Sequence, residues 1–433
     1  MTYEELLEAT QVGAAIRRRR RLQPVGGIGD KIFPPTYPGD NGPRHVFEVR
    51  RVQQTNGEMA NVPCVLIDSV QSQANRLEEA LEAAALRGEI ELPRIVVDFA
   101  GAGFNSIGAI SDLVAPHRIF DAILRDSDLN GTAFRKSEVG EALRLATPAD
   151  ASAILNVSPA SLLFGAWNST GEGGGLGAKF ARAIVSEIVG VGVAMDQSWK
   201  VVRRGAEEYL VTATHSNAGR RTGSRIDPLG SSSSVPIYHK ADDPNDWTID
   251  PAEAQGGPAN PKPFDRKRGS GKPGTAAKVN HGNIPPSVDQ LGVTCDYAEQ
   301  TSVITLAGLR RLSFSGRSDA AKDEAGRAYL AALGLLALTE GDRNGYALRS
   351  RCDLVCDGAA PIELVGFDGS AQAITLSPDN ARHLYQEALR AAREAGFTLS
   401  AAPLQLTPSD KLAQLVRKSQ DKAMDDEADA SED

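Results

Sequence analysis

The pattern of apolar and polar residues predicts helices that alternate with strands. Apolar residues recur at steps of four and three from Val70 to Ala84 after the capping residues Asp68 and Ser69, which predicts a helix with one buried face that ends at Gly88. Strands are predicted at residues 95–99, 162–167, 180–189, 302–314, 346–355 and 362–365. Further helices are predicted to begin at Pro116 and to span residues 135–146, 318–340 and 377–395. Residues 180–189 also fit the spacing of a helix.

This order of elements is typical of an α+β domain. Helices that return repeatedly to a sheet pack on one of its faces, and a ferredoxin-like core with long insertions fits the order best. The largest insertion is residues 227–286, which are rich in Pro, Gly, Ser, Lys and Asp and have almost no periodic apolar pattern. We expect a long, basic, functional excursion there, or a partly disordered one, because such a composition buries little apolar surface.

Composition and charge narrow the class of protein. The chain has 433 residues, 41% of them hydrophobic, which is enough for a full core, and no apolar run is long enough for a membrane helix. We therefore expect a folded cytoplasmic protein. The net charge is −9, but residues 421–433 hold seven acids against Lys422 and account for −6 of it. These residues are expected to form a disordered acidic tail, and basic clusters such as Arg17–Arg21 allow local positive grooves elsewhere.

The four cysteines are too few for a disulfide framework. Cys352 and Cys356 form a CxxxC on a predicted strand, but no second Cys or His pair with metal spacing lies nearby, so we interpret them as small buried apolar residues. We predict neither a metal site nor a cofactor.

The glycine-rich segment Gly171–Phe180, with sequence GEGGGLGAKF, is the most distinctive local motif. Ala178 separates its last glycine from Lys179, so it is not a nucleotide-hydrolysing P-loop. It predicts a cradle of backbone amides for RNA phosphate, formed by Gly174 and Gly175 with Lys179 and Arg182 beside it. A tight glycine turn between two elements explains it equally well.

The start of the helix after Asp68 carries polar side chains that are suited to RNA. Gln71, Gln73, Asn75 and Arg76 lie near the start of the helix after Asp68, where they could contact phosphates or 2′-hydroxyls, or decorate a solvated face. Aromatic residues make up only 5% of the chain, so an array of stacked bases is not indicated.

His281 is the one histidine with a suggestive setting, because Asn280 and Asn283 flank it in the basic excursion. It could act as a general base on a ribose hydroxyl or make a structural contact in a turn. The motifs GxSxG and HExxH are absent, and we predict no catalysis. The alternative is a metal-independent ribonuclease that processes precursor RNA with His281.

Several longer strings, in order along the chain, resemble one family. They include RLQPVGGIGDKIFPPTYPG, LIDSVQSQANRLEEAL, APHRIFDAILRDS, FRKSEVGEAL, FGAWNSTGEGGGLGAKFARAIVSEIVG, GRRTGSRIDPLG, VNHGNIPPS and GVTCDYAEQT. From about Arg17 to Leu312 the chain is similar to Csb-one type RAMP proteins, the Cas-seven backbone subunit of type I-G (formerly I-U) CRISPR complexes. Residues 191–218 look longer than the family pattern, and the acidic tail is not part of it.

The resemblance implies a single RAMP-type domain over residues 1–433, with a modified RRM or ferredoxin-like palm and insertions that act as fingers and thumb. It implies a non-catalytic subunit of a cytoplasmic Cascade ribonucleoprotein. Copies would stack along the guide RNA and present it for pairing with target DNA in antiviral defence, together with other Cascade subunits. The residues expected to contact RNA are Arg20, Arg21, Lys31, Gln71, Gln73, Asn75, Arg76, Gly174, Gly175, Lys179, Arg182, Arg220, Arg221, Arg225, Asn280, His281 and Asn283.

Overall fold

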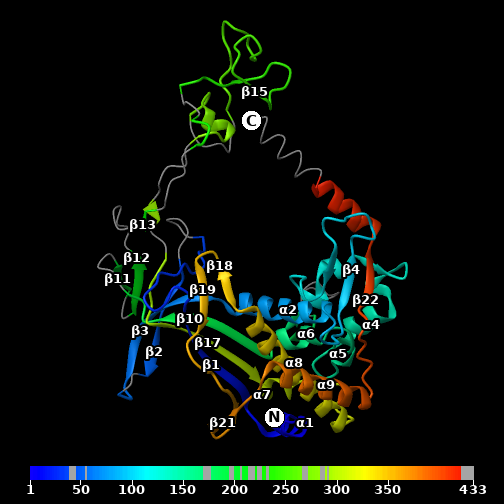
Figure 1. The fold of residues 1–433 in the computed structure, drawn as a ribbon. Coiled ribbons are helices and arrows are strands. Elements are labelled where there is room, and N and C mark those ends of the chain that lie inside the picture. The colour runs from blue at the N-terminus through cyan, green and yellow to red at the C-terminus, as the bar shows by residue number, and fades with distance from the viewer. Residues whose placement is uncertain are drawn as a thin grey trace. The chain divides into compact units, whose positions relative to one another are not determined.

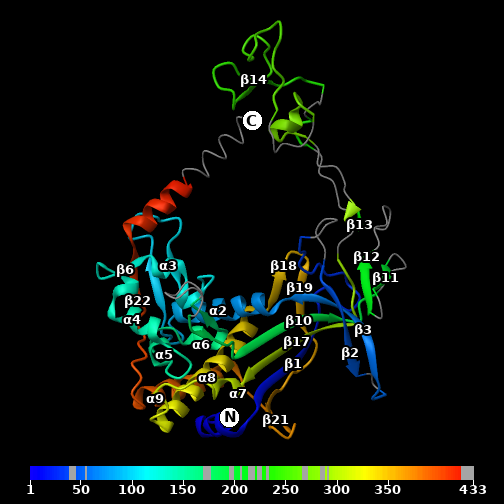
Figure 2. The ribbon, with the colours of Figure 1, turned by 180° about the vertical axis from the view of Figure 1, so that it is seen from behind.

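The chain forms two compact units in a computed structural model. The structure describes residues 1–38, 45–53, 56–168, 177–194, 199–204, 207–212, 220–221, 227–230, 234–265, 272–282, 288–289 and 292–420. Unit 1 consists of Met1–Ala213 with Gly292–Leu412, and unit 2 of Thr214–Leu291 with Ala413–Asp433. The ribbon is drawn from two sides in Figures 1 and 2.

An antiparallel sheet, with strands of different lengths, forms the centre of unit 1. Its strand order is β18-β19-β1-β17-β10-β3-β2, and β20 pairs with β1 and with β21. The bounds are β1 (Ala15–Pro24), β2 (Phe47–Gln53), β3 (Met59–Asp68), β10 (Ile184–Val191), β17 (Tyr297–Thr305), β18 (Tyr346–Arg349), β19 (Cys352–Cys356), β20 (Ile362–Val365) and β21 (Ala371–Ile374). Figure 1 shows β1, β17 and β10 side by side.

The two faces of this sheet differ in burial. Along β17 buried residues alternate with half-exposed ones, so that Gln300, Ser302 and Ile304 point to one face and their neighbours to the other. Helix α2 (Val70–Leu86) packs on the buried face, where the side chain of Gln73 hydrogen-bonds Gln300 and Ser186. The opposite face is more exposed.

Helices cover the buried face of the sheet and complete the core of unit 1. Those of unit 1 outside the smaller sheet are α1 (Tyr3–Val12), α2, α7 (Leu306–Leu309), α8 (Ala320–Asn344) and α9 (Pro378–Glu394). Helix α8 is buried along most of its length, and a Cβ placed on Gly334 would lie 2.8 Å from the Ile304 Cδ1 atom of β17. The absence of a side chain at Gly334 therefore lets α8 lie directly on the sheet.

A smaller sheet and several short helices complete unit 1. The sheet has the order β5-β4-β22-β6-β7, and the pairing of β4 with β22 is parallel. Its strands are β4 (Ile95–Asp98), β5 (Ala109–Ser111), β6 (Ser127–Leu129), β7 (Thr132–Ala133) and β22 (Leu404–Pro408). The short elements around it are η1 (Arg118–Phe120), α3 (Ala122–Arg125), η2 (Phe134–Lys136), α4 (Glu138–Leu145), α5 (Ser152–Val157), α6 (Pro159–Phe164), β8 (Ala166–Trp167) and β9 (Lys179–Phe180).

The described part of unit 2 folds around Phe264, which is fully buried. The imidazole of His239 lies 4.5 Å from the Phe264 ring, its Nδ1 is 2.6 Å from the Pro244 carbonyl oxygen, and its Nε2 accepts the Asp265 N–H. The short elements of unit 2 are β13 (Arg220–Arg221), β14 (Tyr238–His239), β15 (Trp247–Thr248), β16 (Val288–Asp289) and η3 (Ala276–Val279). Ile237, Phe264 and Ala276 thus form a small core within the predicted excursion, which periodicity did not reveal.

The structure confirms the α+β class and most predicted helices, and the fold is consistent with a RAMP-like one. Helix α2 begins after Ser69, whose Oγ accepts the Ser72 N–H, and α9 begins with Pro378 after Ser377, as predicted. Helix α8 extends the predicted helix to Asn344. In the part of the chain that the structure describes, no helix is both long and apolar enough to cross a membrane.

Several predicted boundaries are wrong for identifiable reasons. Pro116 does not begin a helix, because the chain forms a 3₁₀ turn first and α3 is capped by Asp121. Residues 162–164 belong to α6, since Pro159 starts a helix there, and only Ala166–Trp167 of the predicted strand form one, β8. The strand predicted at 302–314 ends at Thr305, whose hydroxyl caps α7.

Two strand predictions have a mixed outcome. Residues 346–355 form two strands, β18 and β19, which are joined by a turn in which Arg351 has a φ of 61°. Residues 184–191 are the strand β10, so the helical alternative for this segment is excluded.

Within the predicted insertion 191–218, β11 (Trp199–Arg204) pairs with β12 (Glu207–Thr212) as a hairpin. The acidic tail 421–433 lies outside the described residues.

Candidate nucleic-acid interface

The exposed face of the central sheet carries a concentration of arginines. In the register of the sheet, Arg19 of β1 lies opposite Thr301 of β17, and Thr301 lies opposite Glu187 of β10. Arg21 lies opposite Glu299 in the next row on the same face. The side chain of Arg19 is 60% exposed, so this face is open to solvent.

A groove of about 530 Å³ runs over this face. Four strands supply its charged side chains: Arg19 and Arg21 from β1, Arg50 and Arg51 from β2, Glu187 from β10, and Glu299 from β17. Valines of β10 and the ring of Tyr297 form part of the apolar floor. Four arginines against Glu187 and Glu299 leave the lining with an excess of positive charge.

Contacts within the groove hold the guanidinium groups in place. Arg19 donates three hydrogen bonds to Glu299, the shortest at 2.8 Å, and Arg50 donates to Glu187 at 2.7 Å. The guanidinium carbon of Arg21 lies 4.3 Å from the centre of the Tyr297 ring. Arg51 donates to the Met59 carbonyl oxygen at 3.3 Å. The groove therefore presents oriented cations rather than freely rotating ones.

The electrostatics of these groups favour binding over proton transfer. The hydrogen bond to Glu299 raises the pKa of Arg19, and burial with the nearby Glu299 charge raises the pKa of Tyr297. Both groups thus keep their protons at neutral pH. Planar guanidinium groups with fixed donors match phosphate oxygens.

The alternate arginines of β1 point to the opposite face and stabilise the fold. Arg18 is 2% exposed and donates to the Asp342 carboxylate at 2.7 Å, and Arg20 donates to the same carboxylate at 2.6 Å. Burial lowers the pKa of Arg20, but the charges of Asp342 and Tyr346 outweigh it and raise the pKa overall. Of the two arginines predicted here to contact RNA, Arg21 therefore lies in the groove and Arg20 does not.

The polar residues of α2 that were predicted to contact RNA also fall into two groups, one engaged inside the protein and one exposed. Gln73 is 3% exposed and also donates to Asp68, so its amide is used inside the protein. Arg76 donates to Asp68 at 2.9 Å and to the Leu348 carbonyl oxygen at 2.7 Å. Gln71 and Asn75 are exposed. Gln73 and the half-exposed Arg76 tie α2 to the sheet, and the exposed pair Gln71 and Asn75 is free of these contacts.

The residues predicted around the glycine-rich segment lie at a different place. Lys179 is exposed on β9, with its Nζ 5.7 Å from the Trp167 ring, and Arg182 donates to the Phe164 carbonyl oxygen. Lys31 is half-exposed in the segment after β1. Gly174 and Gly175 lie outside the described residues, so the predicted amide cradle stays a prediction.

The remaining predicted residues belong to unit 2. Arg220 and Arg221 form β13, and Arg225 and Asn283 lie outside the described residues. His281 donates its backbone N–H to the Ala276 carbonyl oxygen, and its ring meets Trp247 edge-on at 6.3 Å. Asn280 is exposed with a φ of 62° at the end of η3. These contacts are those of a residue in a turn.

Among the described residues, no group of three or more His, Cys, Asp or Glu side chains is arranged to hold a metal ion. Cys352 is buried, as predicted, whereas Cys356 is exposed because β19 reaches the sheet edge at its end. The interpretation of Cys356 as a buried residue is therefore wrong.

Sequence reasoning missed Arg19, Arg50, Arg51 and Tyr297. A usable signal exists for Arg19: Ile16 and Leu22 bracket the arginine run at even positions, so a strand with period two places the odd-numbered arginines on the open face. No local pattern marks the other three, because they reach the groove through strand pairing over long sequence separations.

A family model described as CRISPR-associated protein GSU0053 (Cas_GSU0053) matches residues 16–195, a stretch that begins in β1 and includes β2, β3 and β10. The match covers less than half of the chain. No curated protein matches it. Over these residues the chain is similar to that CRISPR-associated family.

Proposed function

We propose that the protein is a non-catalytic RNA-binding backbone subunit of a type I-G Cascade complex that holds guide RNA in CRISPR defence. The observation that carries the proposal is the groove on the open sheet face, with Arg19, Arg21, Arg50 and Arg51 held by defined contacts. Two supports are independent of it: the family match, which suggests a role in CRISPR defence, and the resemblance of the ordered strings.

The groove suits a sugar-phosphate backbone rather than a sequence. Guanidinium groups spaced along neighbouring strands neutralise successive phosphates, which gives affinity without base readout. Specificity then resides in pairing between guide and target, and the protein holds the guide in shape. The net charge of −9 is no obstacle, because a nearby phosphate responds to the local excess of arginine.

The absence of catalysis is part of the proposal. Arginines whose protons stay bound stabilise phosphate charge but do not exchange protons, and cleavage of RNA by general base catalysis needs a group that does. His281, the candidate base, makes turn contacts in unit 2. Backbone copies and other Cascade subunits are proposed as partners on the resemblance alone.

Co-purification with guide RNA tests the proposal. The full chain would be expressed with its CRISPR repeat RNA, either unchanged or as Arg19→Gln/Arg21→Gln/Arg51→Gln, which removes three groove cations. The matched control is Arg311→Gln/Arg390→Gln/Lys411→Gln, which removes three exposed cations elsewhere. We expect the wild type and the control to elute as a large ribonucleoprotein and the groove variant to lose most of its RNA.

Two outcomes would count against the proposal. An RNA-free monomer in the wild type would remove the binding role altogether, and equal RNA retention in all three proteins would remove the groove as its site. Incubation of precursor RNA with the wild type and with His281→Ala tests the enzymatic alternative. Cleavage by the wild type alone would replace the proposed function with that of a processing ribonuclease.

A further inference from the structure

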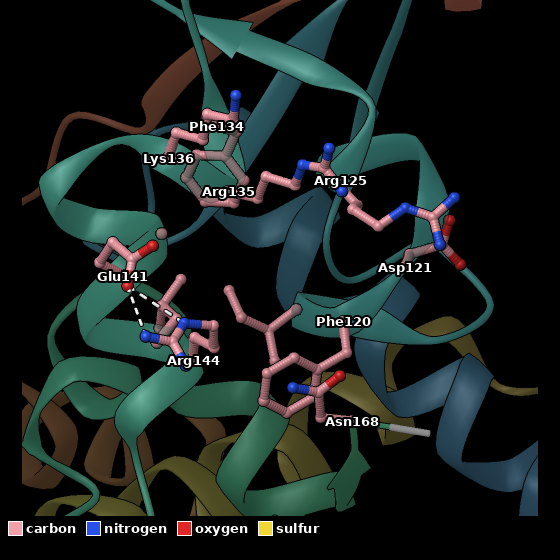
Figure 3. Close-up of a pocket in the computed structure, with 12 residues that line it drawn as sticks. Phe120, Asp121, Arg125, Phe134, Arg135, Lys136, Glu141, Arg144 and Asn168 are labelled. Atoms are coloured by element: carbon pink, nitrogen blue, oxygen red, sulfur yellow. Dashed lines mark hydrogen bonds and ion pairs between the residues drawn. The ribbon is translucent and has the colours of Figure 1, made fainter. Parts of the chain in front are cut away.

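A second basic cavity lies in unit 1, away from the sheet groove. Its volume is about 310 Å³, and it is formed by η1, α3, η2 and α4 together with Asn168. Figure 3 shows Phe120 and Asn168 across the cavity from Phe134, Arg135 and Lys136, with Glu141 and Arg144 on a third side. Neither the family match nor the proposed function assigns it a role.

The charges around this cavity are unbalanced. Glu141 accepts a hydrogen bond from Arg144 at 2.8 Å, and the Arg125 guanidinium is paired with Asp126 at 2.8 Å. The Asp121 carboxylate accepts backbone N–H groups of His117 and Ile123 and is 4% exposed. The lining acids are thus already used by other groups.

Arg135 and Lys136 remain at the rim. Both side chains are exposed, and within the described part of the chain no ion pair or hydrogen bond engages either of them. The nearest carboxylate that acts on Arg135 is that of Asp126, which Arg125 already pairs. The two adjacent cations repel each other, and an anion placed between them would relieve that repulsion. The rim therefore has the charge of an anion site.

The interior of the cavity is apolar and aromatic. Ile119, Phe134 and Leu143 are buried side chains that line it, and the ring of Phe120 is partly exposed there. A ligand that satisfies both regions has a flat apolar part and an anionic part. The volume is at the lower end of the range for small-molecule sites, which suits one compact ligand better than a length of peptide.

We propose that this cavity binds one nucleotide, with the base against Phe120 and the phosphate between Arg135 and Lys136. Stacking on the ring supplies sequence-tolerant affinity, and the Asn168 amide can hydrogen-bond a base edge. The nucleotide is either a free mononucleotide or one nucleotide of a bound strand, since both present the same chemistry. This site goes beyond the proposed function, because it shares no residue with the groove.

Calorimetry with AMP on the RNA-free full chain tests the free-nucleotide source. Arg135→Ala/Lys136→Ala is expected to weaken AMP binding about tenfold or more, since two charged hydrogen bonds are lost. Phe120→Leu keeps an apolar side chain but removes the ring, and is expected to weaken binding about fivefold. Arg311→Ala/Arg390→Ala is the charge-matched control and should bind AMP as the wild type does.

Crosslinking tests the strand source. Single-stranded RNA that contains 4-thiouridine would be irradiated with the same proteins, and crosslinked peptides would be identified by mass spectrometry. Crosslinks at Phe120 or within residues 134–144 that disappear in Arg135→Ala/Lys136→Ala support the site even if AMP gives no heat. AMP binding that is equal in the rim variant and the control would overturn the proposal, as would the absence of both AMP binding and such crosslinks.

The outcome is separable from that of the sheet groove. Arg19→Gln/Arg21→Gln/Arg51→Gln is expected to bind AMP with unchanged affinity, because those side chains lie outside this cavity. Loss of guide retention in the groove variant and loss of AMP binding in the rim variant therefore report on different sites.

Discussion

Replacement of Asp112 by asparagine should remove a pH dependence of the stability of unit 1. Asp112 is 1% exposed, its Oδ1 accepts the Ile95 N–H at 2.9 Å, and its Oδ2 shares a hydrogen bond with the Ser158 hydroxyl. Ser158 in turn lies 2.7 Å from the Ser161 hydroxyl. Burial raises the pKa of Asp112 from 3.8 to about 7, although the hydrogen bonds from Ser158 and Ile95 lower it.

The sign of the effect follows from proton binding. Between pH 3.8 and about 7 the folded state keeps a proton on Asp112 that the unfolded chain has released, so the free energy of unfolding falls as the pH rises through this window. The whole gap corresponds to about 4 kcal/mol, of which about 3 kcal/mol falls between about pH 5 and pH 8. Asp112→Asn carries no charge at either pH and can repeat the hydrogen bonds of the protonated acid.

Urea unfolding followed by circular dichroism measures this difference. Relative to Asp112→Asn, the wild type should lose about 3 kcal/mol of stability between about pH 5 and pH 8. Asp357→Asn is the matched control, because its side chain is exposed and lies outside the buried network. A difference between wild type and Asp112→Asn that stays constant with pH, or that changes in the other direction, would refute the reasoning.

Three other perturbations have expected outcomes. Asp68→Ala should destabilise unit 1 by about 3 kcal/mol in urea, because the buried carboxylate accepts hydrogen bonds from Arg349 and two further side chains. Gly334→Val should lower the melting temperature and cost about 1–3 kcal/mol, since its Cβ would meet Ile304 at 2.8 Å. His239→Ala should make residues 234–265 sensitive to limited proteolysis while unit 1 stays resistant, because both ring nitrogens hold backbone groups of unit 2.

The elements that could be predicted from the sequence are those with a strong local signal. Helix α2 has both a capping serine and an apolar stripe, and α9 has Ser377 followed by Pro378. The local pattern of strand β1 is misleading, because five consecutive arginines are typical of a solvent-exposed segment rather than of a central strand. They form a central strand because Asp342 neutralises Arg18 and Arg20 from a helix more than 300 residues away.

The candidate site was predictable only in part for the same physical reason. Arg21 could be proposed because it belongs to a basic cluster, but Arg50, Arg51 and Tyr297 reach the groove only through the pairing of β1, β17, β10, β3 and β2. From the sequence, Gln73 was expected to be an exposed amide on a helix face. In the structure its side chain faces the sheet and accepts hydrogen bonds from Ser186 and Gln300. Register between distant strands is a tertiary property that local patterns do not encode.

The salt dependence of RNA affinity tests most directly whether the open sheet face holds a nucleic-acid strand by its phosphates. Equilibrium binding of single-stranded repeat RNA would be measured from low to moderate salt for the wild type, Arg19→Gln/Arg21→Gln/Arg51→Gln, and the control Arg311→Gln/Arg390→Gln/Lys411→Gln. Each lost phosphate contact on a single strand lowers the slope of log affinity against log salt by about 0.7, so the groove variant should show a slope shallower by about 2. The same slope in all three proteins would show that RNA lies elsewhere.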